Sequence, residues 1–346
     1  MKLTLRALPP FSFSAVVQSH GWAELAPFGT DAAAGGLTYV HRLDSGRVVE
    51  LRIREAVLDA ELDIRALPSP GPTVETATLG IEPLGGWAPV GEKPAEASTP
   101  AQQMAPIGTE RGVALGADEP IDEFEQAQIA RDAVWMFGLD QDLSPFHALV
   151  REEPKLAQAE VRAQGRILRC PTLFEDAVKT MLTVNTSWAG TIRMVEALVA
   201  QFGDPLPGEA TRRAFPTPER LAAADEGTLR SQTRLGFRAP SVLQLARAVA
   251  SGSLDLESLK TTDLPTAELR QRLLHVRGVG PYAAANLLMI LGRYDFIPVD
   301  SWALKMVSHE WHEGQPVGPV EVEAAFEPWG EWKGLAYWFW DWRTPA

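Results

Sequence analysis

Two glycines interrupt a helical pattern near residue 280 and form the first candidate for chemistry. The segment reads LLHVRGVGPYAAANLL from Leu273 to Leu288. Gly278 and Gly280 permit a tight turn and close approach of another surface, and Pro281 suits the first turn of the second helix. Backbone N–H groups at such a helix start favour a phosphate. A plain turn between two helices fits the same residues, so both interpretations stay open on this segment alone.

A carboxylate follows at the start of the next helical segment. Asp300 ends the apolar run FIPVD and stands twenty residues beyond Gly280. An aspartate before a helix commonly accepts hydrogen bonds from first-turn N–H groups, so the simplest prediction is an N-cap on a helix over 301–307.

Taken together, the hairpin and the aspartate loop resemble the helix–hairpin–helix DNA glycosylases, a family named for this hairpin, a glycine- and proline-rich loop and an aspartate. The matching motifs are VRGVGPYAAANLL and FIPVDSW. The resemblance runs from Phe11 to about His309, most specifically from Gly165 onward, and concerns the 8-oxoguanine and 3-methyladenine branches. It implies damaged double-stranded DNA as the partner, no cofactor, base flipping, and cleavage of the N-glycosidic bond.

The resemblance assigns the catalytic role to Asp300, which would stabilise an oxocarbenium-like sugar and orient or deprotonate the attacking water. The DNA backbone would be held by the hairpin residues Arg277, Gly278, Val279, Gly280 and Tyr282. A monovalent cation could bind the hairpin carbonyls of His275, Arg277 and Val279. No catalytic metal is expected.

Tyr282 bears on the type of reaction. Bifunctional members of the family carry a lysine two residues after the last hairpin glycine, and its amine forms a Schiff base with the sugar. Here that position is Tyr282, and no lysine lies between Lys260 and Lys305. Because a phenol cannot form an imine, the sequence predicts a monofunctional enzyme that leaves an abasic site and has no lyase activity.

Two further segments match places where the family contacts the DNA around the flipped base. VNTSW nominates Asn185 and Thr186 to fill the gap, and GFRAP nominates Phe237 and Arg238 to probe the opposite base. Core packing for Phe237 and a solvent-facing helix cap for Arg238 are the alternatives. A second arginine of the 8-oxoguanine branch corresponds here to Gly190, which argues against strict selectivity for an opposite cytosine.

Different residues favour different classes of damaged base as the substrate. The absence of a lysine at Tyr282 and of an arginine at Gly190 favours an alkylated purine such as 3-methyladenine. The asparagine in the VNTSW turn and the amino-acid sequence of the hairpin favour an 8-oxoguanine-type oxidised purine. Trp302 and Trp188 are the candidates for the base pocket. A lesion-binding protein without catalysis is a third reading, which the presence of Asp300 opposes.

The elements that must position these residues fall into two parts. The runs FSFSAVV, LTYVHRL and RVVELRI predict antiparallel strands, and 67–119 reads as irregular chain with one further strand. From Pro120 onward, helical periodicity and capping signals repeat. We therefore predict an α+β protein with an N-terminal β domain over 1–119 and a helical domain over 120–346, and the resemblance implies that the helical domain has two subdomains that flank a cleft.

The C-terminal segment PWGEWKGLAYWFWDW holds five of the eleven tryptophans. Such a run either packs its indoles into the core or lines a base pocket, and we favour core packing. His309 and His312 stand at an i, i+3 spacing without a further ligand nearby, so an exposed helix end is favoured over a metal site.

The composition limits the mode of nucleic-acid binding, the disulfide content and the location of the protein. The chain has 346 residues and a formal net charge of −13, which opposes coating of nucleic acid by bulk electrostatics. Basic residues are locally enriched, with ten Lys and Arg against six Asp and Glu over 227–305. The single cysteine, Cys170, excludes an intramolecular disulfide. Without a membrane-spanning run or a signal peptide, we expect a cytoplasmic, nucleoid-associated monomer.

Overall fold

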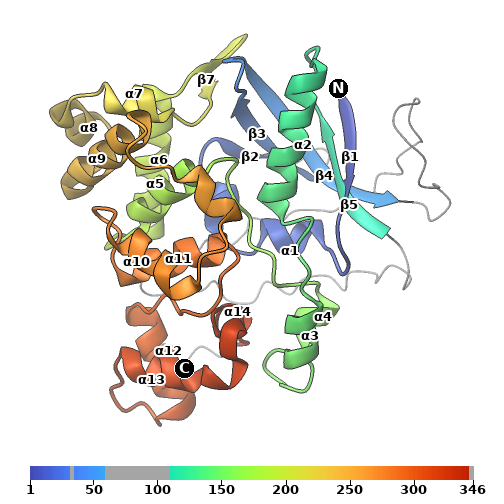
Figure 1. Cartoon of the computed structure of the whole chain (residues 1–346), viewed down its shortest axis with the longest axis vertical. Coiled ribbons are helices and arrows are strands. Elements are labelled where there is room, and N and C mark those ends of the chain that lie inside the picture. The colour runs from blue at the N-terminus through green and yellow to red at the C-terminus, as the bar shows by residue number, and fades with distance from the viewer. Residues whose placement is uncertain (32–34, 59–109, 343–346) are drawn as a thin grey trace.

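The computed structural model describes residues 1–31, 35–58 and 110–342. An antiparallel sheet in the order β1-β5-β4-β3-β2 precedes a largely helical region (Figure 1). The fold is therefore α+β, as predicted. The bounds of the strands are β1 Lys2–Arg6, β2 Phe28–Asp31, β3 Gly36–Arg42, β4 Val48–Leu58 and β5 Glu110–Gly116. Most of the stretch predicted to be irregular, 67–109, lies outside the described residues.

The predicted strands over 37–43 and 47–53 are confirmed as β3 and β4. Leu37 pairs with Ile53, and Tyr39 pairs with Leu51. Val49, Leu51 and Ile53 are buried and alternate with more exposed charged residues along β4. This period of two places one face of β4 on the core.

The prediction of a strand for FSFSAVV is wrong, because Phe13–Val17 forms the short helix α1. The Ser12 hydroxyl caps it by accepting a hydrogen bond from the Ala15 N–H at 3.3 Å. Phe13, Val16 and Val17 are buried, which is the i, i+3, i+4 spacing of a helix face. The strands β1 and β2 were not predicted. β1 pairs with β5, and β2 lies partly in a segment that was predicted to be a turn.

The helices largely follow the predicted segments, and Figure 1 shows them below and beside the sheet, with α2 against the sheet. Their bounds are α2 Glu123–Phe137, α3 Ser144–Val150, α4 Gln158–Val161, α5 Leu173–Thr183, α6 Trp188–Phe202, α7 Pro218–Ala222, α8 Glu226–Gln232, α9 Ala239–Ala250, α10 Thr266–Leu274, α11 Pro281–Ile290, α12 Ser301–Trp311, α13 Pro319–Ala325 and α14 Lys333–Phe339. Short 3-10 turns are η1 Gly21–Glu24, η2 Gly236–Arg238, η3 Glu257–Thr261 and η4 Glu327–Trp332, and a hairpin is formed by β6 Pro205–Leu206 and β7 Glu209–Arg213.

Two large hydrophobic clusters hold these elements together. The first joins the sheet to α2, α5, α6, α9, α10 and α11. The second joins α3 and α4 to α12, α13 and α14. The loop between α11 and α12 crosses from the first cluster to the second. A side chain at the end of this loop therefore lies at the junction of the two clusters.

The C-terminal aromatic run belongs to the second cluster, which confirms core packing for most of it. Trp340 is 6% exposed and its ring lies 5.4 Å from that of Phe326, and Trp342 is 9% exposed. Trp338 is only partly buried and donates its indole N–H to the Ser19 carbonyl at 2.8 Å. No helix in the described part of the chain is both long and apolar enough to cross a membrane.

Candidate active site

The hairpin between α10 and α11 is a tight turn whose two glycines differ in their surroundings. Gly278 has φ +90, and a Cβ at this position would lie 2.6 Å from Met181 Cε and 2.7 Å from Ser241 Cβ. A larger residue is therefore opposed by both backbone conformation and packing. Gly280 is exposed, and no atom lies within 4 Å of the position its Cβ would take. The hairpin thus leans on α5 and α9 through Gly278 and offers an open backbone at Gly280.

The open side of the hairpin is also the start of α11. Gly280 is the N-cap and Pro281 the first residue of the helix. Val279 is buried, and its N–H donates to the Val276 carbonyl at 3.0 Å, which closes the turn. Arg277 is exposed and donates to the Gln244 side chain on α9 at 3.1 Å. A helix N-terminus with an exposed cation beside it can hold an anion such as a DNA phosphate.

Asp300 caps α12, as predicted. Its Oδ1 accepts a hydrogen bond from the Ala303 N–H at 2.8 Å. The side chain is half-buried, and burial raises the pKa of the carboxyl group, while hydrogen bonds from backbone N–H groups offset part of this shift. The helix observed extends further than the predicted 301–307, to Trp311.

The loop that presents Asp300 is fixed from the C-terminal side. The Gly334 N–H donates to the Tyr294 carbonyl at 2.7 Å, and a Cβ at Gly334 would lie 2.7 Å from the same oxygen. The Ile297 N–H donates to Glu323 on α13 at 3.3 Å. Because the start of α14 and the helix α13 both bind the loop, the position of Asp300 depends on the C-terminal cluster.

Two tyrosines from separate helices lie near Asp300. Tyr282 stands in the first turn of α11, and Tyr337 stands on α14. Burial, followed by the negative charge of Asp300, raises the pKa of both phenols. Both are therefore neutral at physiological pH. Sequence reasoning did not single out Tyr337, because its run of aromatic residues predicted packing without showing which ring faces the aspartate.

The two tryptophans nominated for a base pocket lie in different places. Trp302 stands two residues after Asp300, and its ring centroid lies 6.3 Å from that of Tyr337 and 5.4 Å from that of Trp342. Trp188 begins α6, donates its indole N–H to Glu24 at 2.9 Å and packs against η1. These contacts place Trp302 among the aromatic residues of the C-terminal cluster, and the pocket role of both tryptophans stays a prediction.

The residues nominated for contact with the DNA around the flipped base lie at two neighbouring turns. Asn185 is exposed in the turn between α5 and α6, and Phe237 is 63% exposed in η2 before α9. Arg238 is 9% exposed and donates to the Val184 and Asn185 carbonyls. The alternatives of core packing for Phe237 and a solvent-facing cap for Arg238 are therefore wrong.

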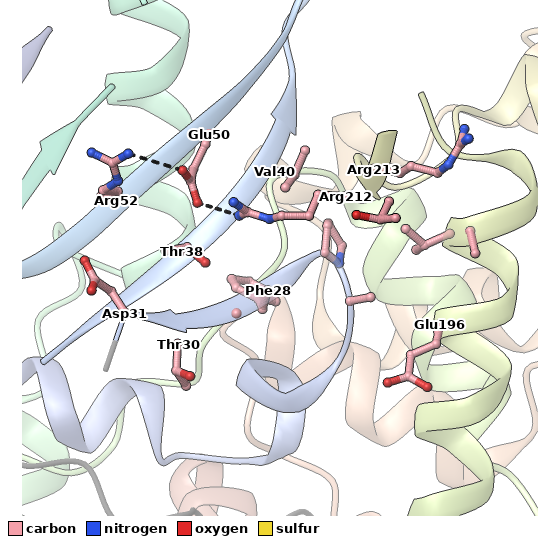
Figure 2. Close-up of a pocket in the computed structure, with 16 residues that line it drawn as sticks. Phe28, Thr30, Asp31, Thr38, Val40, Glu50, Arg52, Glu196, Arg212 and Arg213 are labelled. Atoms are coloured by element: carbon pink, nitrogen blue, oxygen red, sulfur yellow. Dashed lines mark hydrogen bonds and ion pairs between the residues drawn. The ribbon is translucent and has the colours of Figure 1, made fainter. Parts of the chain in front are cut away.

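A separate groove of about 560 Å³ lies between the sheet and the elements α6 and β7. Figure 2 shows Arg212 and Arg52 on either side of Glu50, with which both form ion pairs. None of the residues predicted to form the active site lines it. His309 and His312 stand at the end of α12, and the described residues contain no cluster of three ligands suited to a metal ion.

The hairpin and the aspartate loop fall within a segment that matches a protein-family model. Residues 178–331 match the HhH-GPD superfamily of base excision DNA repair proteins. The chain belongs to this superfamily. The match begins within α5 and ends in η4, so it includes the turns around Asn185 and Phe237 as well as the hairpin and Asp300. At the level of the superfamily, this HhH-GPD protein is a base excision DNA repair protein.

Known proteins extend the similarity beyond the matched segment. A DNA-3-methyladenine glycosylase of Bacillus subtilis is 26% identical over 237 residues, which cover 66% of this chain and 76% of that protein. The structure of a 3-methyladenine DNA glycosylase from Archaeoglobus fulgidus aligns over 98% of this chain and 97% of that one, with a TM-score of 0.64 and 19% identity.

A Clostridium acetobutylicum 8-oxoguanine glycosylase/lyase, solved with double-stranded DNA containing cytosine opposite 8-oxoguanine, aligns over 93% of this chain and 90% of that one. Its TM-score is 0.59 and its identity 18%. These two structural matches show that the sheet and the helical region of this HhH-GPD protein share one overall arrangement with both kinds of enzyme.

Proposed function

We propose that this HhH-GPD protein is a monofunctional DNA glycosylase that removes an alkylated purine and uses water as the nucleophile. The observation that carries the proposal is the environment of Asp300. A half-buried carboxylate ends the loop that joins two hydrophobic clusters, and its charge helps to raise the pKa of two neutral phenols nearby. The hairpin position that would supply an amine for imine chemistry holds a phenol instead.

In the proposed reaction the bond between the sugar C1′ and the purine nitrogen breaks, and its electron pair leaves with the base. Positive charge develops on the sugar, and the Asp300 carboxylate stabilises it. This stabilisation is larger at a partly desolvated site than in bulk water. Water then adds at C1′ and loses a proton to Asp300 or to solvent. The products are the free base and an abasic site.

The hairpin supports the proposal by offering a place for the DNA backbone. Gly280 presents backbone without a side chain at the start of α11, and Arg277 supplies a positive charge beside it. An alanine at Gly280 would place a methyl group where a phosphate must approach. We expect the hairpin to hold the duplex while Asn185, Thr186 and Phe237 occupy the space that the flipped nucleotide leaves.

Support for an alkylated purine comes from the character of the site. An alkylated purine is electron-poor and stacks well on electron-rich rings. Tyr282 and Trp302 are partly exposed and supply such rings, and the buried Tyr337 packs against Trp302. The Bacillus subtilis relative is also named for 3-methyladenine.

A panel of duplexes tests the substrate class. Each duplex carries one lesion, namely 3-methyladenine, 1,N6-ethenoadenine, hypoxanthine, uracil or 8-oxoguanine, and alkali reveals abasic sites after single-turnover incubation. We expect the methylated or etheno purine to be released fastest. Fastest release of 8-oxoguanine would overturn the substrate class while keeping the glycosylase activity. Tight lesion binding without release of any base would instead identify a non-catalytic lesion-binding protein.

A further inference from the structure

The turn between α5 and α6 is held in a conformation that its sequence does not favour. Asn185 has φ +51 and is exposed, and only Val184, Asn185 and Thr186 separate the end of α5 from the N-cap Ser187. A residue other than glycine in the left-handed region is uncommon, although asparagine tolerates it better than most. The surrounding contacts must therefore stabilise this conformation.

Arg238 supplies those contacts from the start of α9. Its Nε donates to the Val184 carbonyl at 3.1 Å, and its Nη2 donates to the carbonyls of Val184 and Asn185, the latter at 3.0 Å. Its Nη1 lies 3.9 Å from the Met194 sulfur on α6. Every nitrogen of the guanidinium thus points toward the α5–α6 turn or the helix behind it.

The same guanidinium also supports Phe237. Its central carbon lies 4.3 Å from the centroid of the exposed Phe237 ring. A cation stacked on an aromatic face favours one orientation of that ring. Arg238 therefore contacts both of the exposed tips that face the DNA in the proposed function, Asn185 through its carbonyl and Phe237 through its ring.

The other position that could carry a base-reading arginine is closed by packing. A Cβ at Gly190 would collide with the Thr186 hydroxyl. The Gly190 N–H also donates to the Ser187 hydroxyl at 3.2 Å, which belongs to the cap of α6. A long side chain at Gly190 would disturb the turn that presents Asn185.

We propose that Arg238 is a positioning residue that couples the Asn185 turn to Phe237, and that it does not read the base opposite the lesion. The inference rests on the proposed function, because the two tips matter only if a nucleotide is flipped. It follows that neither position 190 nor position 238 provides an arginine for an opposite cytosine. The opposite base then affects excision only through the ease with which its pair with the lesion opens.

The test combines Arg238→Ala, Arg238→Lys and Asn185→Gly in a double-mutant cycle. Single-turnover excision is measured on the preferred lesion opposite each of the four bases. We expect Arg238→Ala to lower all four rates by about 10-fold without changing their order. In the Asn185→Gly background the same substitution should have an effect below about threefold, because the turn it positions is already altered. Arg238→Lys should resemble Arg238→Ala, because lysine lacks the planar fork of donors.

A change in the order of the four rates on removing Arg238, or full additivity with Asn185→Gly, would overturn the inference. Arg230→Ala is the matched control, because Arg230 is an exposed arginine on α8 that pairs with Glu226 at 2.6 Å. It should leave the rates unchanged.

A measurement without DNA separates this inference from the proposed function. Hydrogen exchange of the free protein should be faster over 184–187 in Arg238→Lys than in the wild type, while exchange over α10 and α11 stays the same. Equal exchange over 184–187 would contradict the positioning role even in a protein that excises bases. If the wild type releases no base, the proposed function fails, and the exchange result still reports on the turn.

Discussion

Two aspartates in this protein have a pKa raised by burial, but their surroundings differ. Asp176 on α5 is fully buried, and its Oδ1 accepts hydrogen bonds from the Trp22 indole at 2.7 Å and the Cys170 N–H at 3.0 Å. Asp300 is half-buried at the junction of two clusters, and its Oδ1 caps a helix. A raised pKa therefore belongs to a buried, hydrogen-bonded carboxyl group at Asp176 and to a partly accessible one at Asp300.

The region around Asp176 is a buried polar network that joins the sheet to α5. The Lys179 ammonium lies 2.8 Å from Glu175 Oε1, and the Tyr39 hydroxyl donates to Glu175 Oε2 at 2.6 Å. Lys179 is also 3.5 Å from the Cys170 sulfur and 4.9 Å from the centre of the Phe28 ring. Since these groups are enclosed, their chemistry can only serve the fold. Substitutions near Asp176 should therefore affect stability, and substitutions at Asp300 should affect activity.

The largest expected effect is on catalysis at Asp300. Asp300→Asn should lower the single-turnover excision rate about 10³-fold, because the neutral amide cannot stabilise developing positive charge. Asparagine caps helices as well as aspartate does, so the melting temperature should stay close to that of the wild type. Asp176→Asn is the matched control and should keep most of the activity. Equal losses of activity in the two variants would remove the distinction between the regions.

The second effect is on stability in the buried network. Lys179→Met should lower the free energy of unfolding by about 3 kcal/mol or more, because it leaves the Glu175 carboxylate buried without its cation. Arg272→Met removes the cation of another i, i+4 pair, Glu268–Arg272, which is exposed and 3.0 Å long. That change should cost about 0.5 kcal/mol or less. Urea unfolding of both variants measures the difference, and similar losses would mean that the burial of Lys179 does not matter.

The third effect is a pH dependence of stability. Burial raises the pKa of Asp176 to about 7. The folded state therefore binds a proton that the unfolded state has already released, and Asp176 loses stabilising effect as pH rises from its ordinary range through 7. Relative to Asp176→Asn, the wild type should lose about 1–3 kcal/mol of unfolding free energy between pH 5 and pH 8. A constant difference across this range would show that Asp176 titrates elsewhere.

The smallest effect concerns the acid side of the pH–rate profile. If ionised Asp300 is the form that supports excision, the rate falls as pH drops through its pKa, which burial raises. The half-maximal pH should therefore lie above the ordinary aspartate value of about 3.9. Asp176→Asn should leave this limb of the single-turnover profile in place. A limb that moves with Asp176→Asn would assign the titration to the wrong carboxyl group.

The sequence predicts the parts of the site that depend on local rules. The glycines and proline of the hairpin, the N-cap at Asp300 and the apolar helix faces all follow from short-range backbone and burial preferences. The wrong strand at Phe13–Val17 has a local cause as well, because a short apolar run fits strand and helix alike.

Other features depend on contacts between distant residues. Tyr337 lies near Asp300 because α14 folds back on the loop, and the burial of Arg238 depends on how α9 meets the α5–α6 turn. The i, i+4 spacing of Glu175 and Lys179 is visible in the sequence, but it is equally typical of an exposed helix face. Only the three-dimensional structure shows that the Glu175–Lys179 pair is buried between α5 and the sheet.

In the proposed reaction the nucleophile is water and not an enzyme amine. The decisive measurement is borohydride treatment of wild-type protein during excision of its preferred lesion from a labelled duplex. With water as the nucleophile, we expect no protein–DNA adduct and an abasic strand that stays intact until alkali is added. A stable covalent adduct, or strand cleavage without alkali, would contradict it.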